Sequence, residues 1–108
     1  MNIAPQTILD TLLLRCKEHH SPCGQGNLIW REWGEKKLEK HPLILLHGGS
    51  GAWNHWTRTI PALENDFHVY AVDLPGCGDS ADPPKPYDAE SLVNIISIGL
   101  DIILPNDE

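Results

Sequence analysis

The stretch that most constrains this chain is residues 42–51, with the sequence PLILLHGGSG. Residues 43–46 form an unbroken apolar run, which predicts a short strand buried on both faces of a sheet. Gly48, Gly49 and Gly51 follow, and glycine lets another group approach the backbone closely. Because open α/β sheets bind ligands at the ends of such strands, we expect this glycine loop (residues 48–51) to turn backbone N–H groups toward something negative.

The rest of the chain predicts an α/β architecture in which an amphipathic helix and a β-hairpin precede a β-α-β-α series. Residues 1–19 are predicted as an N-terminal helix. A short strand near residues 21–23, turn residues, and a second strand over 28–34 predict the hairpin. The helix prediction depends on apolar residues at helical spacing, which are Ile8, Leu9, Leu12, Leu13 and Cys16.

After the glycine loop, Trp53, Trp56 and Ile60 fall at i, i+3 and i+7, which predicts a helix face packed on the sheet. Pro61 is expected to end or kink that helix. Residues 67–74 predict the next strand, parallel to 43–46 through a right-handed crossover. Asp88 is placed to cap a last helix. The buried face of that helix is predicted to be Leu92, Ile95, Ile96, Gly99 and Ile103.

Charge and composition limit the classes of partner. Eight Lys and Arg against fifteen Asp and Glu give a net charge of −7, which argues against nucleic-acid and anionic-membrane partners. The longest strictly apolar run is far too short to cross a bilayer, and the N-terminus lacks the features of a signal peptide. Cys16, Cys23 and Cys77 form no CxxC pair, so reduced thiols and a cytoplasmic location are expected.

Common cofactor motifs do not fit the glycine loop. No Gly-Lys-Ser/Thr follows Gly48 or Gly49, and Asn54 stands where a dinucleotide fingerprint needs glycine or alanine. A transient oxyanion therefore suits the loop better than a stable phosphate, and no cofactor is predicted. His19 and His20 diverge on a helix, so we interpret them as a solvated helix end and predict no metal site.

Two motifs together resemble the N-terminal half of an α/β-hydrolase. They are HGGSGAWNHW and, after a short helix, FHVYAVDLPGCGDS, and the resemblance covers most of residues 20–104. It implies that residues 20–108 form a partial α/β-hydrolase domain, truncated before the nucleophile strand. It also implies that the loop supplies one backbone N–H of the oxyanion hole, from Gly49 or, as second choice, Ser50. The residues to which the resemblance gives a structural role are His47, Gly48, Gly51, Asp73, Gly76, Gly78 and Ser80.

The chain departs from the family pattern at the nucleophile. No G-x-S-x-G is present, Ser97 lies within a predicted helix, and Cys77 has no base placed for it. His47 precedes the site and is interpreted as a structural hydrogen-bonder, and Asp73 as a brace for its turn. We therefore expect no catalytic triad member in this chain.

The leading hypothesis is a hydrolase fragment that acts, in the intact enzyme, on an ester-type or C–C bond of a small molecule. The alternative is a non-catalytic module that binds a small ligand or a partner through the same loop. In the family's sheet order the strand over 43–46 lies between the fourth and fifth strands. Because no fifth strand is present, we expect one edge of it to be unpaired and the isolated chain to self-associate.

Overall fold

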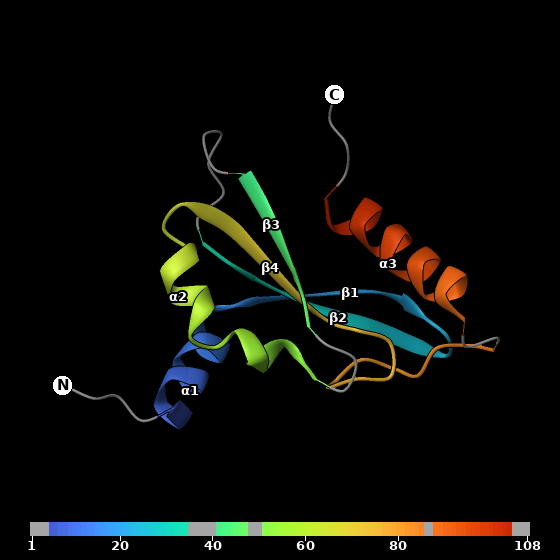
Figure 1. Cartoon of the computed structure of the whole chain (residues 1–108), viewed down its shortest axis with the longest axis horizontal. Helices are drawn as coiled ribbons and strands as arrows, with labels where there is room; N and C mark the ends of the chain where they lie inside the picture. The colour runs from blue at the N-terminus through green and yellow to red at the C-terminus, as the bar shows by residue number, and fades with distance from the viewer. Residues whose placement is uncertain (1–4, 35–40, 48–50, 86–87, 105–108) are drawn as a thin grey trace.

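The computed structural model describes residues 5–34, 41–47, 51–85 and 88–104. Its mixed four-stranded sheet with helices on both sides confirms the predicted α/β class (Figure 1). A 3₁₀ turn over Trp53–Trp56 precedes the second helix. The elements in chain order are α1 (Pro5–Arg15), β1 (Lys17–Cys23), β2 (Gly26–Trp33), β3 (His41–Leu46), α2 (Thr59–Leu63), β4 (Phe67–Asp73) and α3 (Ala89–Ile103).

The sheet has the strand order β1-β2-β4-β3. Strands β1 and β2 form an antiparallel hairpin, and β2 also pairs antiparallel with β4. Strand β3 pairs parallel with β4, with Leu43 opposite Val69 and Leu45 opposite Ala71, which confirms the predicted parallel pair. The chain crosses from β3 to β4 through the 3₁₀ turn and α2, so the glycine loop begins this crossover at the C-terminal end of β3.

Two apolar clusters cover the two faces of the sheet. Figure 1 shows α1 and α2 on one side of the sheet and α3 on the other. The cluster beneath α1 and α2 consists of Leu12, Trp33, Leu45, Trp53, Ile60, Val69 and Ala71. The cluster beneath α3 has Cys23, Leu28, Trp30 and Val72 at its centre. The alternation along β2 sends Trp30 to one cluster and Trp33 to the other, as a strand period of two requires.

Helix α3 lies against the β1–β2 hairpin through Gly99. A Cβ on Gly99 would come within 2.7 Å of both Ser21 Oγ and Trp30 Cζ2, so the helix needs a glycine at this crossing. Asp88 caps the helix, as predicted, because its carboxylate accepts the Ser91 N–H at 2.8 Å. The hydrogen bonds from Ser91 also lower the pKa of Asp88.

The apolar residues of α3 divide between a side that faces the sheet and a side that is exposed. Ile95, Ile96 and Ile103 are half-buried against the cluster beneath the helix, because α3 lies directly over it. The strongly exposed apolar side chains of α3 point the other way and are Val93, Ile98 and Ile102.

The N-terminal helix is shorter than predicted. It ends at Arg15, and the segment from Lys17 belongs to β1, so the prediction of a helix over residues 1–19 is wrong at its C-terminal end. The physical reason is tertiary: residues from Lys17 onward pair along their whole length with β2, and this ladder outweighs the local helical spacing. The interpretation of His19 and His20 as a solvated helix end is therefore also wrong.

His19 belongs instead to a polar group on the α3 face of the sheet. Its Nε2 lies 2.6 Å from Glu32 Oε1, and the other oxygen of Glu32 contacts His68, which in turn meets the Tyr70 hydroxyl. Burial would raise the pKa of Glu32, but the hydrogen bond from His19 and the neighbouring His68 outweigh burial and lower it. Burial, with the charge of Glu32, raises the pKa of Tyr70 to about 12.

The segment between β3 and β4 is also divided differently from the prediction. The expected single helix is a 3₁₀ turn followed by α2, although Trp53 and Ile60 do share one cluster and Trp56 packs against it. Pro61 neither ends nor kinks α2, because it lies in the first turn, where a missing N–H leaves no helical hydrogen bond unmade.

Candidate functional site

The candidate site is the glycine loop at the C-terminal end of β3. Gly48, Gly49 and Ser50 lie outside the described residues, so the assignment of the Gly49 and Ser50 N–H groups as oxyanion donors stays a prediction. Gly51 is described and buried. The residues on both sides of the loop are also described, and they show how the loop is attached to the sheet.

His47 anchors the start of the loop. The side chain is buried, and its Nε2 accepts the Leu74 N–H at 2.9 Å. Leu74 directly follows β4, so this bond ties the end of β3 to the end of the neighbouring strand. Because Nε2 accepts a hydrogen bond, its lone pair is engaged there and is not directed at a reacting atom.

Asp73, the last residue of β4, anchors the other side of the loop. Its Oδ1 accepts the Trp53 N–H at 2.7 Å, and its Oδ2 accepts the Asp79 N–H at 2.9 Å. The carboxylate is completely buried. One side chain therefore joins Trp53, two positions after the glycine loop, to the turn that follows β4.

The turn over residues 75–80 is shaped around the Asp73 carboxylate. Gly76 and Gly78 have φ values of +79° and +51°, which other residues rarely adopt. A Cβ on Gly78 would come within 2.5 Å of Asp73 Oδ2, so close packing also requires glycine there. Ser80 closes the turn: its Oγ donates to the Asp73 carbonyl at 2.5 Å and accepts the Ile29 N–H at 2.8 Å.

Arg31 is a residue of this site that was not predicted from the sequence. Arg31 lies on β2 and is buried, with Nη1 3.2 Å from Asp73 Oδ2 and Nη2 2.7 Å from Asp79 Oδ2. Its guanidinium carbon is 5.3 Å from the centroid of the Trp53 ring, within the range of a cation–π contact. The sequence did contain a signal for this residue: on one face of the predicted strand, Arg31 is the single cation and lies between two apolar residues, Ile29 and Trp33.

Neither possible nucleophile lies at the C-terminal end of β3. Ser97 is exposed in the middle of α3, not on a strand-to-helix turn. Cys77 is half-buried in the turn after β4, with its N–H donating to the Leu74 carbonyl at 2.9 Å. Within residues 5–34, 41–47, 51–85 and 88–104, no group of three or more His, Cys, Asp and Glu side chains is placed to hold a metal ion.

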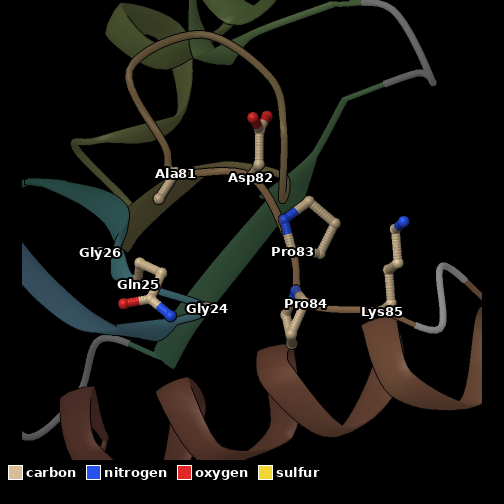
Figure 2. Close-up of a pocket in the computed structure, with 8 residues that line it drawn as sticks. All are labelled: Gly24, Gln25, Gly26, Ala81, Asp82, Pro83, Pro84 and Lys85. Carbon is tan, nitrogen blue, oxygen red and sulfur yellow. The ribbon is translucent and has the colours of Figure 1, made fainter.

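A hollow of about 680 Å³ lies beside the hairpin turn and is lined by residues 24–26 and 81–85. Figure 2 shows Gln25 on the hairpin side of it and Pro83 and Pro84 across from the turn. Gly24 is required at this turn, since its φ is +57° and a Cβ would lie 2.6 Å from the Asp82 carbonyl. No helix in the described part of the chain is long and apolar enough to cross a membrane.

Comparison with known proteins identifies the family. A family model for the alpha/beta hydrolase fold matches residues 41–103, which is more than half of the chain. The chain belongs to the alpha/beta hydrolase fold family. This membership confirms the resemblance stated from the HGGSG and DLPGCGDS motifs, and the matched segment of this alpha/beta hydrolase chain includes both of them.

Individual relatives match part of the chain. It is 44% identical over 52 residues to a soluble epoxide hydrolase from Corynebacterium sp. (strain C12), covering 48% of this chain and 18% of the relative. It is 41% identical over 56 residues to a pimeloyl-[acyl-carrier protein] methyl ester esterase from Vibrio parahaemolyticus, and the match covers 52% of this chain and 20% of the relative. The chain thus spans about a fifth of the length of these two curated relatives.

The solved structures support the same fold. Cfl2 from Burkholderia cenocepacia superposes with a TM-score of 0.69 at 26% sequence identity. The match covers 82% of this chain and 30% of Cfl2. Most of the chain therefore corresponds to a minor part of a larger hydrolase fold.

Proposed function

We propose that this chain supplies the first half of a hydrolase oxyanion hole. The donor is the backbone N–H of Gly49, with that of Ser50 as second choice. The reaction class is hydrolysis of an ester-type or C–C bond in a small molecule. The observation that carries the proposal is the attachment of the glycine loop: His47 at its start and Trp53 after its end are both hydrogen-bonded to the end of β4.

This attachment suits an oxyanion donor because such a donor works only when it is held in place before charge develops. One fixed donor is typically worth ~2.7–4 kcal/mol of transition-state stabilisation. The attached loop lies at the C-terminal end of a parallel strand, where open α/β sheets bind their ligands. The names of two relatives, an epoxide hydrolase and a methyl ester esterase, support hydrolysis as the reaction type.

We also propose where the rest of the catalytic site comes from and where in the cell the protein works. In the intact enzyme the three members of the catalytic triad, which are a nucleophile, an acid and a histidine, come from polypeptide outside residues 41–103, and the substrate is a small molecule. We place the protein in the cytoplasm, where Cys16 and Cys23 would stay as the reduced thiols seen in the structure. The partners we propose include neither nucleic acid nor membrane, in keeping with the net charge of −7.

The second candidate is a non-catalytic module that binds a small carboxylate through the same loop. It is favoured by the positions of Ser97 and Cys77, neither of which lies at the end of β3. The two candidates differ in a simple measurement. A binding module alone should show saturable binding of acetate or a similar small acid, while an incomplete hydrolase site should restore turnover when the rest of the domain is supplied.

We expect the purified chain to hydrolyse p-nitrophenyl acetate no faster than an inert protein at the same concentration, because a donor without a nucleophile has no acyl intermediate to stabilise. A second experiment uses a chimera of the Vibrio methyl ester esterase in which residues 41–103 of this chain replace the esterase's own matching segment. This chimera should hydrolyse the methyl ester that the esterase hydrolyses. A folded but inactive chimera would contradict the proposal. Saturable turnover by the chain alone that is lost in Ser97→Ala or Cys77→Ala would contradict the site assignment.

A further inference from the structure

We propose that Arg31 is a positioning residue for the glycine loop, acting through Asp73 and Trp53. The inference deepens the proposed function, since the loop it positions is the one that carries the proposed oxyanion donor. Arg31 contacts two groups. One is the Asp73 carboxylate, which accepts the Trp53 N–H, and the other is the indole of Trp53 itself. Trp53 is the first residue of the 3₁₀ turn after the loop.

The first of these groups is the Asp73 carboxylate, whose two oxygens have different partners. Oδ1 accepts the Trp53 N–H at 2.7 Å, while Oδ2 receives both the Asp79 N–H and Arg31 Nη1. Rotation of the carboxylate would break the bonds on both oxygens at once. The contact from Arg31 to Oδ2 therefore also fixes the direction of Oδ1 toward the Trp53 amide.

The second group is the Trp53 indole. The Arg31 guanidinium carbon lies 5.3 Å from its centroid, and the Trp33 ring packs on Trp53 at a centroid distance of 5.3 Å. The indole is thus held between a cation and an apolar ring. The same guanidinium therefore constrains the Trp53 backbone amide through Asp73 and the Trp53 indole by direct contact.

The charges around Arg31 explain why the position needs a planar fork rather than any cation. Its side chain is only 4% exposed, and it faces Asp73 at 3.2 Å, Asp79 at 2.7 Å and Glu18 at 3.7 Å. Nη1 and Nη2 address two different carboxylates, while Nε is buried with no hydrogen-bond partner among the described residues. A lysine would keep the charge but could not reproduce both contacts and the stacking on Trp53.

Hydrogen–deuterium exchange followed by mass spectrometry tests this proposal in the full chain without requiring catalysis. The readout is the exchange rate of residues 51–56 divided by that of residues 67–72 in β4, because a general loss of stability raises both rates together. We expect this ratio to rise on the order of tenfold in Arg31→Met, since the loss of a charge-assisted contact loosens Asp73 and hence the Trp53 amide. Arg31→Lys, which retains the buried charge and so the fold, should raise the ratio less.

The matched control is Arg15→Met. Arg15 also forms an arginine–carboxylate pair, with Nη1 2.8 Å from Glu64 Oε2, but this pair is on the surface and links the end of α1 to the residue that follows α2. The exchange-rate ratio of Arg15→Met should equal that of the wild type. The proposal would be overturned if the exchange-rate ratio is unchanged in both Arg31 variants, or if it rises as much in Arg15→Met as in Arg31→Met. It would also be overturned if residues 51–56 of the wild-type chain are not protected from exchange. An inactive esterase chimera with a raised ratio in Arg31→Met would overturn the proposed function but not the positioning role.

Discussion

Replacing Asp73 by alanine is expected to lower the free energy of unfolding by about 3–5 kcal/mol, the usual cost of removing one partner from a buried ion pair. The carboxylate is completely buried and accepts from Trp53 N, Asp79 N and Arg31 Nη1. Alanine would leave two backbone N–H groups and a buried guanidinium short of an acceptor. Because small domains are stable by only ~5–15 kcal/mol, this loss is a large share of the total.

Urea unfolding monitored by tryptophan fluorescence, at one low protein concentration for all variants, measures this effect. The matched control is Asp88→Ala, which removes an exposed carboxylate that also accepts a backbone N–H, from Ser91 at 2.8 Å. Loss of that helix cap should cost only about 1 kcal/mol. An Asp73→Ala variant that loses no more stability than Asp88→Ala would contradict the central place given to Asp73.

The second large effect concerns the free edge of β3. This strand pairs with β4 on one side, and the described residues contain no strand on its other side. Residues 43–46 of this strand are all apolar, and Leu46 is 49% exposed. An open apolar edge is a template for pairing with another chain, and two copies of β3 can pair antiparallel about a twofold axis. We therefore expect the chain to sediment as dimers or larger species whose share rises with concentration.

Leu46→Lys should shift the sedimentation profile toward a single chain, because an edge lysine opposes strand pairing. Leu14→Lys is the control: Leu14 is apolar and 87% exposed, but it lies on α1, away from the edge. That variant should sediment like the wild type. A wild-type chain that is monomeric with a sharp cooperative melting transition would contradict the self-association proposal.

The sequence predicted best the features that depend on local pattern. The apolar run of β3, the glycines after it and the β4 motif predicted a parallel strand pair, and the structure has that pair. Asp88 was likewise predicted as a helix cap from its position alone, and it caps α3. The cap depends on a few neighbouring residues, and the strand pair follows from the β-α-β order, because a short crossover between two buried strands places them parallel.

The features that were missed depend on which distant segments meet. Local spacing continues a helix through His19, but β1 begins at Lys17 because β2 pairs with it, and that pairing also brings His19 to Glu32. Arg31 belongs to the site only because β2 lies beside β4 and so brings the guanidinium to Asp73, 42 positions later in the chain. A single sequence contains all the residues of such contacts but does not show which of them pair.

The direction of the Gly49 amide tests the central claim most directly. The measurement is a crystal structure that resolves residues 48–50 together with the end of β3. We expect the Gly49 N–H, or failing that the Ser50 N–H, to point into the open mouth of a pocket at the C-terminal end of β3, with no carbonyl of the chain as its acceptor. Both amides donating to carbonyls within a regular helix or strand ladder would contradict the assignment of this loop as an oxyanion donor.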